Sequence, residues 1–172
     1  MHVDLRSFLC FALCHLRITQ KLGRSDALVL STLFYACFED KEQTEGIQKA
    51  LRHVFVEDSP GRKGKDLHIF SKKFVFIPIN KDRSHWVLVV VVNPGHIMNF
   101  YKKDNRKHPM PLMLHLDSLP EGKGEDGFRG EVHANLVEFL KHAWDLTNPT
   151  AKEEGEHSFT TDSLPLFSPL GE

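Results

Sequence analysis

The run Trp86–Val92 constrains the fold of this chain more than any other segment. It is apolar at every position, which is typical of a strand buried on both faces. It is also far too short for the roughly 18–20 residues that a membrane-spanning helix needs. Two shorter strand-like segments flank it, Phe74–Ile79 and Leu112–Leu116. The polar hexapeptide Asn80–His85 is a suitable hairpin connection, whereas the 19 residues 93–111 predict an inserted surface loop.

Helical patterns precede and follow these strands. Apolar residues recur at helical spacing in segments 4–18, 27–38 and 44–54, and again in 131–146 after a charged, glycine-rich stretch. The order helices, strands, helix predicts an α+β domain. The tail 147–172 holds three prolines and no sustained periodicity, so we expect it to be loosely ordered.

The balance of charge and the small number of cysteines exclude several classes of protein. Lys and Arg number 22 and Asp and Glu 23, so the net charge of −1 gives no global electrostatic reason to bind nucleic acid or a membrane surface. Cys10, Cys14 and Cys37 show no C-x-x-C spacing and encode neither a disulfide scaffold nor a zinc ribbon. We therefore expect no metal, no cofactor and a reducing intracellular compartment.

Two polar residues flank neighbouring strands of the predicted sheet. His85 precedes the strand that begins at Trp86, and Asp117 follows the strand that ends at Leu116. If these strands pair antiparallel, both residues lie at one sheet edge, where the carboxylate can orient the imidazole and leave its second nitrogen as a general base. The alternative is that both side chains meet water or cap turns. His115, within the second of these strands, is expected to be packed or to face the surface.

Several of these residues lie in a pattern that resembles a known family. Asp66–Asn80, the dipeptide His85-Trp86 and the run Leu114–Ser118 are similar to the sentrin/SUMO-specific cysteine proteases of the Ulp type. The resemblance implies a papain-like (Ulp-type) α+β fold over residues 1–146. That fold has N-terminal helices, a short central mixed or antiparallel sheet and a following helix.

The resemblance also implies roles for three residues. His85 matches the family's general base, Asp117 matches the carboxylate that orients it, and Trp86 matches the aromatic residue that covers the tunnel for the substrate's Gly-Gly tail. Taken alone, Trp86 also fits an ordinary core aromatic at the start of a strand. The implied partner is SUMO or another ubiquitin-like modifier and its conjugates, bound by a monomer in the nucleus or the cytoplasm.

The chain departs from the family at the nucleophile. The family's Asp-Cys-Gly turn does not occur, residues 159–172 hold no glutamine for an oxyanion hole, and no Trp-Leu-Asn-Asp signature precedes Asp4. All three cysteines lie before His85 in helix-like segments, where we expect small buried or flanking residues rather than thiolates. The sequence therefore predicts a Ulp-type domain that is cut at both ends and has no peptidase turnover of its own.

Three functional hypotheses follow. The first is a SUMO-specific cysteine-type isopeptidase or peptidase by descent, acting in protein deSUMOylation. The second is a non-catalytic pseudoprotease that binds a ubiquitin-like protein without cutting it. The third is a non-functional fragment of an incomplete gene model, in which a central strand lacks apolar cover.

Overall fold

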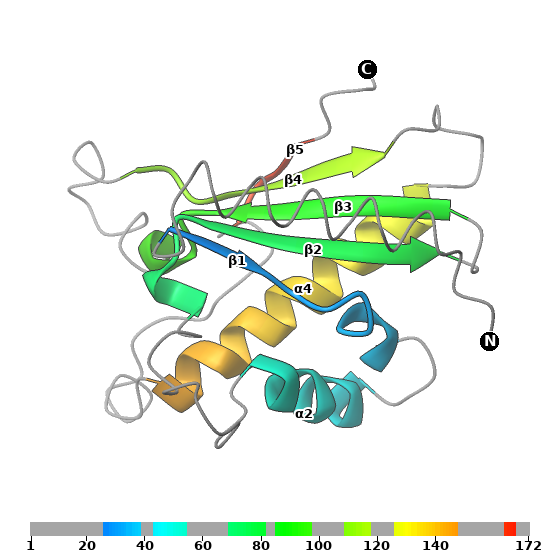
Figure 1. Ribbon diagram of the computed structural model, residues 1–172, viewed down its shortest axis with the longest axis horizontal. Helices are drawn as coiled ribbons and strands as arrows, with labels where there is room; N and C mark the ends of the chain where they lie inside the picture. Colours follow the sequence, from blue (N-terminus) through cyan, green and yellow to red (C-terminus); the bar gives the residue numbers. More distant parts are fainter. Residues whose placement is uncertain are drawn as a thin grey trace.

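The computed structural model describes residues 26–38, 43–54, 69–81, 85–97, 109–117, 126–147 and 164–167. These residues form a mixed sheet of five strands in the order β1-β2-β3-β4-β5. Helices α2 (Gln43–Val54) and α4 (Asp126–Thr147) cover one face of that sheet (Figure 1). The α+β class predicted from the order of the elements is confirmed. The predicted helix over 4–18 lies outside the described residues.

The middle of the sheet is the antiparallel trio that the sequence predicts. β2 (Phe74–Lys81) pairs with β3 (His85–Val92), and β3 pairs with β4 (Leu112–Asp117). The β2–β3 register extends to the pair Lys81↔His85. His85 is therefore the first residue of β3 rather than the last residue of the connection, and the strand's hydrogen bonding fixes its backbone.

The sequence does not predict β1 (Ala27–Val29), and the helix expected over Ala27–Phe38 is wrong. This segment forms β1, which pairs parallel with β2, and then the single turn η1 (Tyr35–Cys37). The physical reason is the open edge of β2. The carbonyl of Asp26 accepts hydrogen bonds from the amides of Lys73 and Phe74, and nearby backbone groups of both strands pair in the same way. Those partners outweigh the helical spacing of the apolar side chains.

The tail after Thr147 contains more structure than the sequence predicts. Leu164 is fully buried, and the short strand β5 (Leu166–Phe167) pairs parallel with β4. The amide of Met113 donates a hydrogen bond of 2.9 Å to the carbonyl of Pro165. The expectation of a loosely ordered tail is therefore wrong for residues 164–167. The division of the chain into 1–146 and 147–172 stays a prediction.

The two main helices differ in how well the sequence predicts them. α2 agrees closely with the predicted helix over 44–54, whereas α4 begins at Asp126 rather than at 131. Gly127 and Gly130 lie in the first turns of α4, where their low helix propensity argues against a helix. Phe128 packs against the hydrophobic core, and this contact holds the first turns to the sheet.

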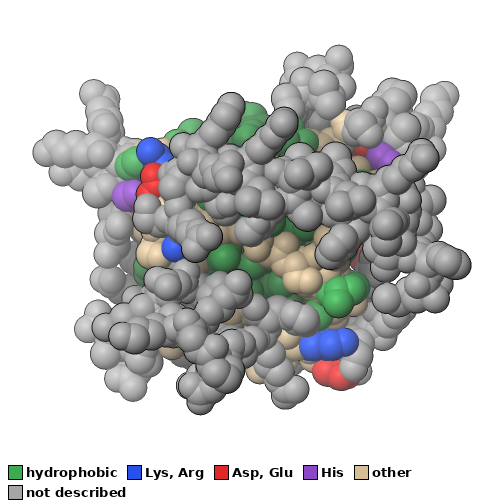
Figure 2. All heavy atoms as spheres, viewed as in Figure 1, with side chains coloured by type: hydrophobic (Ala, Val, Ile, Leu, Met, Phe, Trp, Pro, Cys, Tyr) green, Lys and Arg blue, Asp and Glu red, His purple; other side chains and the backbone are tan. Residues whose placement is uncertain are grey.

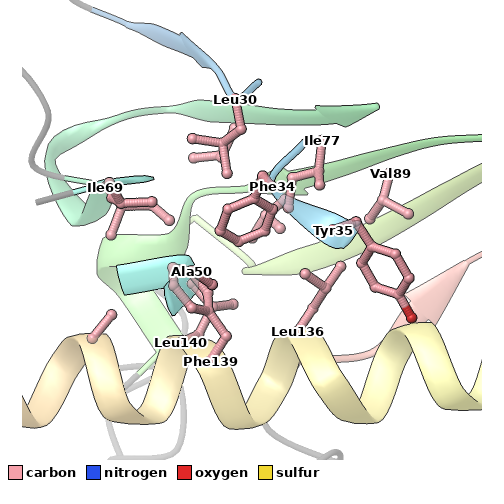
Figure 3. Close-up of a cluster of buried hydrophobic side chains, with 14 of the residues drawn as sticks. Leu30, Phe34, Tyr35, Ala50, Ile69, Ile77, Val89, Leu136, Phe139 and Leu140 are labelled. Carbon is pink, nitrogen blue, oxygen red and sulfur yellow. The ribbon is translucent and has the colours of Figure 1, made fainter. Parts of the chain in front are cut away.

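The hydrophobic core lies between the sheet and its helices. Figure 3 shows Val89 of β3 in one cluster with Leu136 and Phe139 of α4. The ring centroids of Phe34 and Phe139 are 4.9 Å apart, in an edge-to-face arrangement. The helical stripe predicted for α4 is buried along its length: Val132, Leu136, Phe139, Leu140 and Ala143.

Two short 3-10 turns mark the end of the sheet that lies away from His85. η3 (Ile69–Ser71) precedes β2 and η4 (Pro94–His96) follows β3.

On the face in Figure 2, hydrophobic side chains gather in the middle, and charged and histidine side chains lie towards the margin. None of the described helices is long and apolar enough to cross a membrane.

Candidate active site

The register of β3 and β4 brings His85 and Asp117 to one edge of the sheet. Asp117 lies opposite Val87, and His85 is two residues before Val87 on the same strand. Because side chains alternate between the faces of a strand, all three side chains lie on the same face. Val87 is buried beneath the helices. The pair therefore continues the row of core residues to the point where that row reaches solvent.

The two side chains are in hydrogen-bond contact. The Nε2 atom of His85 lies 2.5 Å from Oδ1 of Asp117, and the side chains are 17% and 18% exposed. An ionised carboxylate is only an acceptor, so the contact assigns the Nε2 proton to His85 as donor. The Nδ1 atom then carries the lone pair and can accept a proton from another group. The predicted meeting of these residues is confirmed, whereas their catalytic roles stay predictions.

Trp86 is adjacent to His85 in sequence but lies on the opposite face of β3. It pairs with Asn80 of β2 and is half-buried. Strand alternation directs its ring away from the face that carries the His85–Asp117 contact. A group that reached both side chains would have to pass around the start of β3. The role of Trp86 as a cover for a substrate tail stays a prediction.

Cys37 occupies a closed position in η1. It is 2% exposed, and its Sγ atom lies 3.7 Å from the carbonyl oxygen of Leu33. The interpretation of Cys37 as a small buried residue is confirmed. Cys10 and Cys14 lie outside the described residues.

His115 is a polar residue of this region whose importance the sequence analysis missed. It is 2% exposed and lies two residues before Asp117, on the same face of β4. Burial, followed by the nearby Arg129 cation, lowers the pKa of His115 below its ordinary value of 6.5, although Asp117 opposes the change. Alternation along β4 is the signal that could have placed His115 beside the pair.

Among the described residues, no group of three or more His, Cys, Asp or Glu could hold a metal ion.

Comparison with known proteins gives consistent matches. Residues 8–159 match the model of the Ulp1 protease family, C-terminal catalytic domain. The chain is 32% identical over 124 residues to ubiquitin-like-specific protease 1D of Arabidopsis thaliana, a match that covers 72% of this chain and 18% of that protein. It is 27% identical over 108 residues to the probable ubiquitin-like-specific protease 2A of the same plant, covering 63% of this chain and 13% of that protein.

A solved structure of the C-terminal Ulp1 protease domain in complex with Smt3, the yeast ortholog of SUMO, is also similar. The TM-score is 0.45 at 19% identity, and the match covers 83% of this chain and 47% of that one. The chain thus spans less than a fifth of the two plant proteins and about half of the solved domain.

Proposed function

The chain belongs to the Ulp1 protease family, and from that premise we propose that it carries the histidine–aspartate part of a cysteine peptidase site that acts on ubiquitin-like modifiers. The observation that carries the proposal is the contact between His85 Nε2 and Asp117 Oδ1. The proposed partner is SUMO or another ubiquitin-like modifier joined to a lysine. The proposed location is the nucleus or the cytoplasm.

The geometry supports His85 as the general base and Asp117 as the residue that orients it. A thiol presented to Nδ1 of His85 would transfer its proton there and become a nucleophilic thiolate. The Asp117 carboxylate would stabilise the resulting imidazolium and hold the ring through Nε2. After the thiolate attacks the carbonyl carbon that follows the Gly-Gly tail, His85 would return the proton to the leaving amine. Water would then hydrolyse the thioester and release the modifier.

The tail of the modifier is the proposed ligand of Trp86. A Gly-Gly segment has no side chains, so it can lie closer to an aromatic ring than any other dipeptide. The half-buried ring of Trp86 lies on the opposite face of β3 from His85, so a tail held by Trp86 would reach His85 by passing around the start of that strand. We propose that Trp86 holds the tail while His85 takes and returns the proton that the attack on its last carbonyl requires.

A binding-only function is the second candidate, and the burial of Cys37 favours it. The Cys37 thiol is enclosed and contacts the Leu33 carbonyl, so it is not presented to a substrate. A chain that binds a modifier without a nucleophile beside His85 would hold conjugates and leave them intact. The two candidates share the same ligand and differ in whether a covalent adduct forms.

A titration with a ubiquitin-like modifier tests the proposed function. The isotope-labelled chain is titrated with SUMO that ends in Gly-Gly and, as a control, with SUMO that lacks these two residues. We expect saturable binding that moves the Trp86 indole resonance, and at least a tenfold weaker affinity for the shortened modifier. Trp86→Ala should weaken binding of the full modifier to the same level, with a thermal melt to show that it folds. If no saturable binding occurs up to high micromolar concentrations, the proposed function is wrong.

A modifier with a carbon electrophile at its C-terminus separates the two candidates. We expect Cys37 to remain unmodified, since its thiol is buried. An adduct mapped by mass spectrometry to Cys10 or Cys14, and abolished by His85→Gln, would show that the chain supplies its own nucleophile. Saturable binding without any adduct would favour the binding-only function.

A further inference from the structure

His115 occupies a position where the core would ordinarily hold an aliphatic side chain. It lies opposite Val89 of β3 and between Met113 and Asp117 on one face of β4. Val89 and Met113 are fully buried, and His115 is 2% exposed. The row of side chains beneath α4 therefore changes from apolar to ionisable one position before it reaches Asp117.

The buried imidazole is incompletely paired. Its Nδ1 atom is enclosed and has no hydrogen-bond partner among the described residues. A buried nitrogen without a partner destabilises the fold, and leucine would fill a similar volume without that penalty. A polar side chain at such a position calls for a reason other than packing, and the neighbouring pair of His85 and Asp117 offers one.

The charges around His115 favour its neutral form. Burial is the main cause that lowers the pKa of this residue, followed by repulsion from Arg129 of α4, with a smaller repulsion from His85 of β3. Asp117 of β4 is the neighbour that favours a proton on His115. On α4, His133 contacts the Leu164 carbonyl through Nε2, and residues 164–167 next to β4 contain no ionisable side chain.

We propose that His115 is a positioning residue for His85 and Asp117: enclosed on the same face of β4 as Asp117, it leaves the carboxylate to orient His85 while it is uncharged and competes for that carboxylate once it carries a proton. The catalytic meaning of this role rests on the proposed function, whereas the coupling of the three side chains does not. A cation at position 115 would compete for the carboxylate and repel an imidazolium at His85. At acidic pH, His85 would then lose part of the interaction with the Asp117 carboxylate that holds its ring in one orientation.

Nuclear magnetic resonance of the ring nuclei tests this coupling in the 172-residue chain. The His85 ring signals are followed from pH 8 to pH 4.5 in the unaltered chain and in His115→Gln, which cannot take up a proton. In the unaltered chain we expect an inflection of the His85 signals that coincides with the titration of His115. In His115→Gln that inflection should be lost. His142→Gln, which changes a more exposed histidine of α4, is the control and should keep it.

A second variant keeps the proposal testable even if His115→Gln does not fold. In Asp117→Asn the attraction that favours a proton on His115 is removed, so the pKa of His115 should fall further. If His85 titrates identically with and without His115, or if His115 titrates unchanged in Asp117→Asn, the proposal is overturned. Neither readout involves a modifier, so failure here is distinct from failure to bind SUMO.

Discussion

The middle and the edge of the helix-covered face are built by the same strands but are stabilised in different ways. In the middle, Val91 and Met113 lie opposite each other and pack among many apolar side chains from both helices. At the edge, two partly exposed side chains, those of His85 and Asp117, are joined by a hydrogen bond. Period-two alternation delivers both sets of residues to one face.

This difference separates stability from chemistry. Side chains in the middle have many partners, so they determine whether the domain folds. The side chains at the edge remain partly accessible, which is what proton transfer to a substrate requires. Substitutions in the middle should therefore change the free energy of unfolding by several kcal/mol, and those at the edge should change titration and binding with smaller effects on stability.

The largest effect is expected from Phe139→Ala in α4. Phe139 is fully buried and makes edge-to-face contacts with Phe34 and Phe38, at centroid distances of 4.9 and 6.4 Å. Truncation should lower the free energy of unfolding by about 3–5 kcal/mol, measured by urea denaturation. The control is Leu146→Ala on the same helix, where the side chain is 63% exposed and a change within about 0.5 kcal/mol is expected. Equal losses in the two variants would contradict the view of α4 as the main cover of the core.

Two glycines should respond to alanine in opposite directions. A Cβ atom on Gly46 of α2 would lie 2.7 Å from the carbonyl oxygen of Cys37, so backbone would have to move. We expect Gly46→Ala to destabilise the fold by about 1–3 kcal/mol, as overpacking does. A Cβ atom on Gly130 of α4 would have no other atom within 4 Å. Alanine there should therefore stabilise the helix by about 0.5–1 kcal/mol.

Thermal melts of the two alanine variants measure this contrast directly. A rise in melting temperature for Gly130→Ala with a fall for Gly46→Ala would show that the packed interior and the open start of α4 differ as described. A stabilising Gly46→Ala would mean that α2 and η1 can separate at little cost.

The parts of the fold that follow from local pattern could be predicted from the sequence. The apolar run after His85 identifies β3, and its pairing with the segments on either side fixes the edge at which His85 meets Asp117. The meeting could be predicted because antiparallel neighbours bring the start of one strand beside the end of the next.

The parts that depend on tertiary pairing could not be predicted. In segment 27–38 the apolar spacing fits a helix, and only the unpaired edge of β2 decides for a strand. β5 is two residues long, so it has no period to detect and exists because β4 offers an open edge. The early start of α4, which brings Arg129 near enough to His115 to lower its pKa, is hidden in the sequence by two glycines.

The smallest expected effect is a dependence of stability on pH that arises at His115. Folding lowers the pKa of His115 below 6.5, so between that value and the lower folded value the unfolded chain binds more protons than the folded chain. The contribution of His115 to the free energy of unfolding is therefore fully present above about pH 6.5 and is lost as the pH falls towards the folded pKa. Urea denaturation at pH 7.5, 6.5 and 5.5 should show a larger loss in the unaltered chain than in His115→Leu, since all other ionisable groups are common to both. At pH 7.5 the leucine variant should already be at least as stable, because it removes the enclosed Nδ1 atom. If the difference in free energy of unfolding between the two chains does not change with pH, His115 takes up its proton as readily in the folded domain as in water. His115 of β4 would then be exposed to solvent in the way that His85 is.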